Sequence, residues 1–356
     1  MSQPLAPQLN RDYMLRILDM LLQTPSPSGF CTDIMRKVKE ETANLGYALE
    51  LTPKGNGIIT IPGDAADRVI GLSAHVDTLG AMVRSINANG TIRFTPIGGY
   101  AMQTVEGEYC RIHTRGGRTY EGTVLSTKTS VHVYPDARDW KREEANMEIR
   151  IDEMVKSKED VEKLGIAVGD FISWDPRTRI MPNGWIKSRH LDDKASVAAL
   201  FGLMEWLKRE GRRPPCTLKL ILSTYEEVGH GSSYIPPEIT ELIAVDMGAM
   251  GDDLSATETD VSICAKDSTG PYDYNMTTRF IELAKRENIP YAVDIYPHYG
   301  SDASAALQAG SNIRAALIGP GVHASHGMER THRDAIFHTA ALLLAYVMEP
   351  PSEPAL

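Results

Sequence analysis

The stretch Leu222-Ser223-Thr224-Tyr225-Glu226-Glu227-Val228-Gly229 joins the end of an apolar run to two adjacent carboxylates. Most residues of Leu218–Leu222 are hydrophobic, which predicts a strand over Thr217–Thr224 with both faces covered. Two acids at the end of such a strand are costly to bury unless something positive meets them. A metal pair would meet them, with one carboxylate as a ligand and its neighbour as a proton carrier. A solvated loop is the simpler interpretation of the pair taken alone.

The composition is that of a soluble globular protein. The chain has 356 residues, of which 42% are hydrophobic and 24% charged, and this length allows two domains with their own cores. The net charge is -10 and no basic, aromatic-rich stripe is visible, which argues against a nucleic-acid partner. No apolar run approaches the ~20 residues of a membrane span, and residues 1–10 do not resemble a signal peptide. We therefore expect a cytoplasmic protein.

The cysteines carry a separate prediction about redox state. They are scattered along the chain without CxxC spacing. This pattern favours free buried thiols in a reducing compartment over disulfides or a thiolate zinc site. The residues concerned are Cys31, Cys110, Cys216 and Cys264.

Two kinds of pattern divide the chain into domains. Residues 81–182 hold short β-type runs with frequent glycines, which indicate an inserted small β-barrel-like domain. Residues 1–80 and 183–356 predict an α/β catalytic domain with a mostly parallel central sheet flanked by helices. Its expected helices are Asp12–Leu22, Cys31–Leu45, Asp193–Arg209, Thr277–Glu287, Ser301–Gly310 and Asp334–Val347. Its expected strands are Ala48–Thr52, Gly57–Ile61, Arg68–Ala74, Thr217–Thr224, Leu242–Val245, Ala292–Tyr296 and Ile313–Ile318. Those of the inserted domain are Ala81–Ile86, Thr91–Pro96, Tyr109–Thr114, Thr119–Val124 and Phe171–Trp174.

Candidate metal ligands stand where predicted strands end. Because ligands of open α/β sheets gather outside the carboxyl ends of the strands, residues far apart in sequence are expected to meet at one edge. The candidates at these positions, or at the start of the helix near residue 193, are His75, Asp77, Asp192, Glu226, Glu227, Asp246 and a histidine of the loop Gly319–His326. His323, His326 and His332 compete for the last role. Nitrogen and oxygen ligands of this kind suit zinc, cobalt or manganese.

A second ion would require a bridging carboxylate. Asp192, on the turn His190–Asp193, is the natural bridge between two ions about 3.5–4 Å apart. A water between the ions would lose a proton near neutral pH and become the nucleophile. With Glu227 as a ligand, Glu226 is left to carry a proton to the leaving amine. Asp77 would hold or orient the imidazole of His75.

Several segments resemble the peptidase M42 family, the cobalt- or zinc-dependent aminopeptidases that include the tetrahedral (TET) and glutamyl aminopeptidases. They are Ala74-His75-Val76-Asp77-Thr78-Leu79-Gly80, Leu164-Gly165-Ile166-Ala167-Val168-Gly169-Asp170, Leu191-Asp192-Asp193-Lys194, Glu226-Glu227-Val228-Gly229, Ala244-Val245-Asp246, Gly300-Ser301-Asp302-Ala303 and His326-Gly327-Met328-Glu329. Their order runs through nearly the whole chain. Two departures concern substrate preference more than metal binding: Thr78 stands where an acid is common, and Gly327-Met328 replaces a small-Pro pair.

The resemblance implies two divalent ions per chain and dodecamers built from dimers, with the site facing an internal chamber. The inserted domain would serve this oligomerisation. The implied metal ligands are His75, Asp192, Glu227, Asp246 and His326. The resemblance further implies Glu226 as general base and Asp77 as its supporter. The segment Ser325–His332 is most similar to an M42 subgroup linked to bacterial osmoprotectant dipeptide pathways.

The function predicted from these residues is removal of N-terminal residues from short peptides. The main alternative is a metal-dependent amidohydrolase of N-acyl amino acids or of a dipeptide-like osmolyte, since the same centre serves both reactions. A non-catalytic assembly protein would be expected to lack a ligand, and a glycosidase would use two carboxylates without metal. His230 and His298 are expected to be pocket or structural residues, not ligands.

Overall fold

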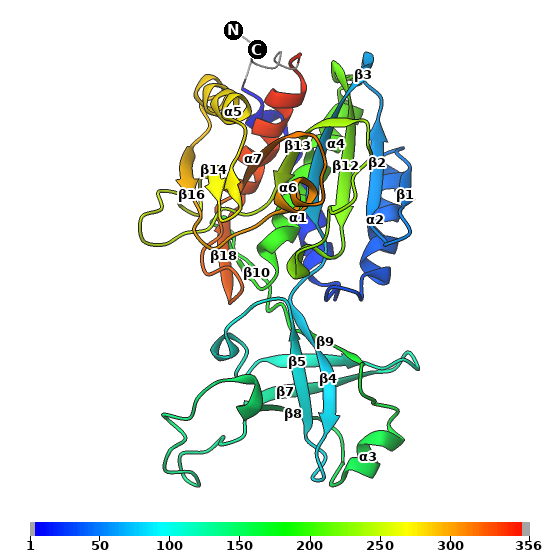
Figure 1. Ribbon diagram of the computed structural model, residues 1–356, viewed down its shortest axis with the longest axis vertical. Coiled ribbons are helices and arrows are strands. Elements are labelled where there is room, and N and C mark those ends of the chain that lie inside the picture. The colour runs from blue at the N-terminus through cyan, green and yellow to red at the C-terminus, as the bar shows by residue number, and fades with distance from the viewer. Residues whose placement is uncertain (1–3, 351–356) are drawn as a thin grey trace.

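The structure, a computed structural model, describes residues 4–350, except for the side chains of residues 66 and 67. It consists of a larger unit built around a mixed sheet and, below it, a smaller closed barrel, joined by a narrow waist (Figure 1). Both units have separate apolar cores. This is the expected α/β unit with an inserted β domain.

The large sheet is parallel at its centre and antiparallel at its edges. Its order is β1-β2-β12-β3-β13-β17-β14-β15, and β16 pairs with β14. The four central strands β12, β3, β13 and β17 pair in parallel, whereas β2 and β14 flank them antiparallel. The strands are β1 (Leu49–Leu51), β2 (Gly57–Ile61), β3 (Ala65–His75), β12 (Cys216–Ser223), β13 (Ile239–Val245), β14 (Val261–Asp267), β15 (Gly270–Pro271), β16 (Tyr291–Ile295) and β17 (Arg314–Pro320). Parallel central strands place their carboxyl ends at one edge of the sheet.

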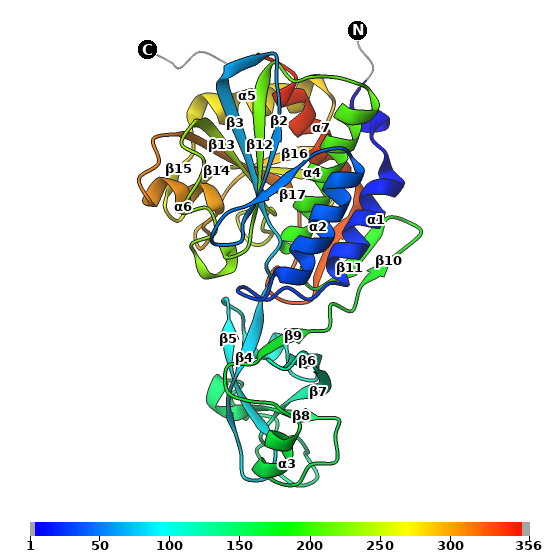
Figure 2. The same ribbon diagram turned by 90° about the vertical axis from the view of Figure 1, so that its right-hand side faces the viewer.

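Helices cover both faces of this sheet. One face packs in the main core against α1 (Arg11–Leu22), α2 (Thr32–Asn44), α4 (Leu191–Arg209), α5 (Tyr274–Arg286) and α7 (Arg333–Val347). The other face forms a smaller core with α6 (Asp302–Gln308), and Figure 2 shows α6 and α1 on opposite sides of the sheet. Short 3-10 turns cover Ala6–Gln8, Met102–Thr104, Glu144–Asn146 and Glu226–Val228. All six predicted helices are present.

The small unit is a six-stranded barrel in the order β4-β5-β8-β7-β6-β9. Its elements are β4 (Gly80–Ile86), β5 (Ile92–Ile97), β6 (Tyr109–His113), β7 (Thr119–Ser126), β8 (Met147–Ile151), α3 (Lys158–Lys163) and β9 (Phe171–Trp174). A separate sheet of β10 (Arg179–Ile180), β11 (Trp185–Ser188) and β18 (Glu329–His332) follows it. We propose residues 81–182 as the extent of the inserted unit, with β10 at its junction to the catalytic unit.

Two simpler expectations can also be compared with the structure. All four cysteines are free and buried, as predicted. Within residues 4–350, no helix combines the length and the apolarity that crossing a membrane requires.

The barrel contacts the catalytic unit through a half-buried aromatic stack. The ring of Phe30 lies 4.7 Å from the ring of His113 and 5.3 Å from that of Phe171. Nε2 of His113 is 2.8 Å from the hydroxyl of Ser173. Burial, with a smaller contribution from Arg111, lowers the pKa of His113 to about 4. The folded protein therefore holds this imidazole neutral.

We expect the stability of the protein to fall as the pH drops from 6.5 towards 4. The unfolded chain binds a proton at His113 in this range and the folded chain does not, so the lowered pKa costs up to about 2–3 kcal/mol at the acid end. A His113→Gln variant lacks this titration. Thermal unfolding of both proteins at pH 7.5 and pH 5 measures the difference, and an equal pH dependence in the two would contradict it.

Candidate metal centre and active site

His75 is the last residue of the central strand β3, and its side chain is buried. Its Nδ1 lies 2.9 Å from the backbone carbonyl of Asp77, which fixes the tautomer with the proton on Nδ1. Its Nε2 then presents a lone pair, and this atom lies 3.1 Å from Oδ1 of Asp192. The imidazole is thus oriented as a metal-binding histidine is oriented by its outer hydrogen bond.

Asp192 stands at the start of α4, where the backbone is not yet helical and the peptide bond to Asp193 is cis. Its two carboxylate oxygens face different histidines. Oδ1 is 3.1 Å from Nε2 of His75, and Oδ2 is 3.4 Å from Nε2 of His326. Its backbone N–H donates to Oε2 of Glu329 at 3.1 Å. Asp192 therefore lies between two groups of potential ligands.

His326 and Glu227 form the second of these groups. Nε2 of His326 is 3.3 Å from Oε2 of Glu227. Nδ1 of His326 is hydrogen-bonded to the carbonyl of Gly99 in the barrel unit. As in His75, a backbone carbonyl therefore orients the ring and leaves Nε2 facing a carboxylate. The other oxygen of Glu227, Oε1, is buried and has no hydrogen-bond partner. An unpartnered buried carboxylate oxygen requires an explanation, and a cation supplies one.

Asp246 completes the first group. It follows the last residue of β13, and one ligand atom each from His75, Asp192 and Asp246 lie within 4.8 Å of one another. Oδ1 of Asp246 accepts the backbone N–H of Met247 at 2.7 Å. A Cβ on Gly319 would lie 1.8 Å from the carbonyl oxygen of Asp246, so only glycine lets β17 approach this closely.

Glu226 faces the same space from the other side. Its Oε2 is 3.8 Å from Nε2 of His75. The carboxylate of Asp77 accepts the backbone N–H groups of Glu226 at 3.2 Å and of Glu227 at 3.3 Å, and the Ser28 hydroxyl donates to it as well. Asp77 therefore holds the 226–227 turn and, through its carbonyl, His75. The sequence suggested a link of Asp77 to His75, and the family resemblance suggested one to Glu226, but neither indicated hydrogen bonds to the backbone of this turn.

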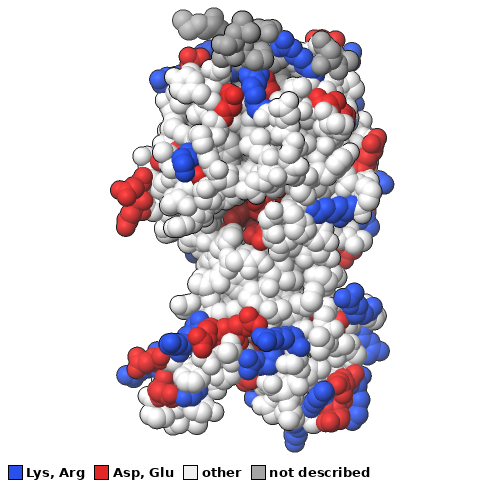
Figure 3. Space-filling model, viewed as in Figure 1, with Lys and Arg blue, Asp and Glu red and all other residues white. Residues whose placement is uncertain are grey.

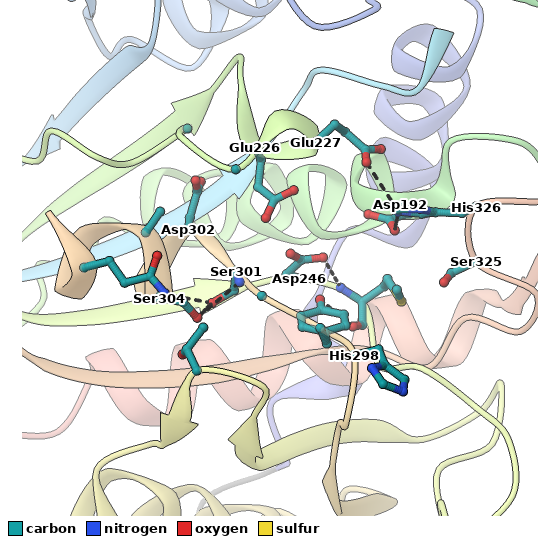
Figure 4. Close-up of a pocket in the computed structure, with 18 residues that line it drawn as sticks. Asp192, Glu226, Glu227, Asp246, His298, Ser301, Asp302, Ser304, Ser325 and His326 are labelled. Atoms are coloured by element: carbon teal, nitrogen blue, oxygen red, sulfur yellow. Dashed lines mark hydrogen bonds and ion pairs between the residues drawn. The ribbon is translucent and has the colours of Figure 1, made fainter. Parts of the chain in front are cut away.

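A cleft of about 440 Å³ is lined by Asp192, Glu226, Glu227, Asp246 and His326. Figure 3 shows acidic side chains in a hollow of the large unit, and in Figure 4 Asp192, Glu226, Glu227, Asp246 and His326 surround one space. The far side of the cleft is polar and includes Ser301, Ser304 and His298. The placement of His298 agrees with the expected pocket role.

The other histidines considered from the sequence lie outside the group. The side chain of His323 is exposed, and its backbone pairs with Arg330. His332 bonds the carbonyl of Asn183. His230 stacks on Tyr225 at 5.1 Å between ring centroids. Of the three competing C-terminal histidines, only His326 therefore faces Asp192.

Comparison with known proteins places the chain among peptidases. The sequence model of the M42 glutamyl aminopeptidases matches residues 55–342. The putative aminopeptidase YhfE of Bacillus subtilis is 47% identical over 337 residues, which are 94% of this chain and 97% of YhfE. The chain belongs to the M42 peptidase family. It is a hydrolase of the aminopeptidase type.

Solved structures share the fold of this M42 peptidase. The aminopeptidase APDkam598 of Desulfurococcus kamchatkensis has a TM-score of 0.86 at 22% identity, with 96% of each chain covered. The TET1 peptidase of Pyrococcus horikoshii, which can assemble into a tetrahedron or a large octahedral shell, has a TM-score of 0.82 at 21% identity and covers 95% of this chain and 100% of its own.

Burial, followed by the crowding of carboxylates, determines the electrostatics of the M42 site. Burial and the neighbouring Asp192 raise the pKa of Glu227 to about 8 and that of Asp246 to about 7. Burial likewise raises the pKa of Glu226 well above its usual range. Burial alone would lower the pKa of His326, but Asp192 and Glu227 raise it to about 11. The protein atoms alone thus disfavour the charged forms of these carboxyl groups, which a bound cation would stabilise.

Divalent cations fit this donor set. Both imidazoles have Nδ1 tied to a carbonyl and Nε2 turned towards carboxylate oxygens, an arrangement in which a cation can sit between nitrogen and oxygen. The buried oxygen of Glu227 would gain a partner. Nitrogen and carboxylate donors in this mixture suit zinc, cobalt or manganese.

Sequence reasoning missed the role of Glu329. Its carboxylate is buried and accepts two backbone N–H groups, that of Asp192 at 3.1 Å and that of His326 at 3.1 Å. One side chain therefore fixes the backbone beside both of these residues. The available signal was an acid three positions after His326 within a motif of the family, but only the fold brings Asp192 to it.

Proposed function

We propose that this M42 peptidase removes N-terminal residues from short peptides with two divalent ions held by His75, Asp192, Glu227, Asp246 and His326. The observation that carries the proposal is the position of Asp192, whose two oxygens face different histidines. Asp246 joins His75 on one side, and Glu227 joins His326 on the other. A bridging carboxylate between two ions has this geometry.

The bound ions would supply Lewis-acid activation of the scissile carbonyl and of the attacking water. The remaining chemistry belongs to the chain. Glu226 lies in the cleft beside His75 and is not assigned to either ligand group, so it can take a proton from the water and deliver it to the leaving nitrogen. Asp77 holds Glu226 and Glu227 by their backbone N–H groups, so that the base and the ligand keep a fixed relation.

The ions proposed are zinc or cobalt, with manganese as a third choice, and the compartment is the cytoplasm. For the assembly we propose dimers that associate into a dodecamer. The closed shells of the TET1 peptidase of Pyrococcus horikoshii support this proposal, since its chain has the same two-unit fold.

A substrate panel with metal control tests the proposed reaction. We expect aminoacyl substrates and short peptides with a free amine to be hydrolysed and their N-acetylated counterparts to be left intact. Chelator should abolish turnover, and zinc or cobalt should restore it, because the carboxylate cluster needs cations to bind and polarise a substrate. Metal content per chain, measured alongside, should be near two. Faster hydrolysis of N-blocked substrates would instead favour an amidohydrolase, and full activity in chelator would refute the metal mechanism.

A further inference from the structure

Arg189 is a buried cation between the two units of the molecule. It precedes α4 by two residues, and 6% of its side chain is exposed. Two of its guanidinium nitrogens donate to Oε2 of Glu108 in the barrel unit, at 3.0 and 2.7 Å. Glu108 is equally buried, with 4% of its side chain exposed, and it also lies 3.5 Å from the exposed Arg177. Burying such an ion pair costs desolvation free energy, which good hydrogen bonds must offset.

The third guanidinium nitrogen of Arg189 bonds the backbone next to a proposed metal ligand. Nη1 of Arg189 donates to the carbonyl of Gly327, the residue after His326, at 3.2 Å. Nη2 also donates to the carbonyl of Thr104 in the barrel unit. Arg189 therefore connects the backbone beside His326 to the segment 98–108 of the barrel.

The same barrel segment touches His326 directly. The carbonyl of Gly99 accepts the hydrogen bond from Nδ1 of His326. Gly98 before it has φ +77, and a Cβ there would lie 2.4 Å from the side chain of Leu79, so this position needs glycine. Segment 98–108 thus supplies an acceptor for the ring of His326 and, through Arg189, a support for its backbone.

We propose that Arg189 is a positioning residue of the active site, through which segment 98–108 of the barrel fixes His326 and its loop. The proposal rests on the proposed function, since it concerns the side chain assigned to the second ion. His326 has φ +60, a conformation that side-chain-bearing residues seldom adopt without outside support. Arg189 and Glu329 provide that support from two sides. The barrel is accordingly part of the site as well as a candidate assembly unit.

The test is the affinity of the metal-free protein for zinc, measured by competition with a chromogenic chelator. Arg189→Met should weaken the binding of one zinc ion about 10–100-fold, as loss of an outer support of a ligand does. Arg189→Lys should not restore it, because an ammonium group cannot reach Glu108 and the Gly327 carbonyl at the angles of the planar guanidinium fork. Activity at saturating zinc should show the loss mainly in kcat, because His326 is misplaced beside the reacting carbonyl.

A double variant separates positioning from stability. Arg189→Met with Glu108→Met replaces the charge pair by apolar side chains of similar size and should fold even if the single variant does not. We expect it to regain the thermal midpoint of the parent while zinc binding stays weak. Recovery of parental zinc affinity in the double variant would overturn the proposal, because the effect of Arg189 would then be stability alone.

Arg142→Met is the matched control. Arg142 donates to Glu106 at 2.8 Å in the barrel, and Glu106 is two residues from Glu108. The other described hydrogen bonds of Arg142 go to carbonyls of the same unit, those of Ala137, Arg138 and Trp140. Zinc affinity should be unchanged in this variant. A loss equal to that of Arg189→Met would show that any damage to the barrel has this effect, and would also overturn the proposal. If the parent itself binds no zinc, the proposed function fails, whatever the Arg189 variants show.

Discussion

Glu226→Gln is expected to lower kcat by about 10²–10⁴-fold while the protein keeps its full metal content. Glutamine has the shape of glutamate but cannot accept the proton of the attacking water. The backbone N–H of Glu226 is fixed by Asp77, and its side chain is 16% exposed in the cleft, so the substitution leaves the surroundings in place. The loss should therefore concern proton transfer, with KM changed little.

Glu227→Gln provides the matched comparison for this prediction. The two residues are adjacent on the same turn, yet Oε2 of Glu227 faces His326 and its side chain is only 2% exposed. We expect the change at Glu227 to weaken metal binding, so that added metal recovers part of the activity, whereas added metal should not help Glu226→Gln. Steady-state kinetics and metal analysis of both variants decide the matter. Near-parental kcat in Glu226→Gln would remove this residue from the reaction.

The central part of the fold could be predicted because its signals are local. The apolar run of β12 predicts a strand, and the amphipathic pattern of α1 predicts a helix. Because ligands gather at the carboxyl ends of parallel strands, His75 and Asp246 are then expected at one edge of the sheet. The reasoning missed β14 (Val261–Asp267) of the large sheet, and it fails more generally for short polar strands. β18 (Glu329–His332) is a strand because it pairs with β11, and nothing in its four residues indicates that partner.

The strand β8 shows a different cause of failure. Met147–Ile151 alternates buried and more exposed residues, as a barrel strand should, but it lies just after a charged stretch and is missing from the strands predicted above. The outer supports of the site failed for a third reason. Glu329 and Arg189 act on partners 137 and 81 residues away, so their roles depend on the finished fold. Residue type reveals candidate ligands, and only tertiary structure reveals what holds them.

Asp192→Asn is expected to remove both metal ions from the protein in one step. Each oxygen of Asp192 serves a different group of ligands, with His75 on one side and His326 on the other. An asparagine offers one neutral oxygen and one NH2 group, which a cation repels. Loss of an outer support of a metal ligand lowers metal affinity about 10–100-fold, and the loss of Asp192 should lower the affinity for zinc by more than this. Activity should fall below detection at ordinary metal concentrations.

His326→Gln is the matched comparison for Asp192→Asn. His326 belongs to one side of Asp192 only, so its loss should cost one ion and leave the group of His75 and Asp246 able to bind the other. A titration of metal-free protein with zinc counts the ions directly. Thermal unfolding gives a second measure, because an ion that binds only the folded chain raises the midpoint. This rise should nearly vanish in Asp192→Asn and be partly retained in His326→Gln. If Asp192→Asn still bound one zinc ion tightly, the carboxylate would serve a single ion, and the bridging role on which the proposed reaction depends would have to be abandoned.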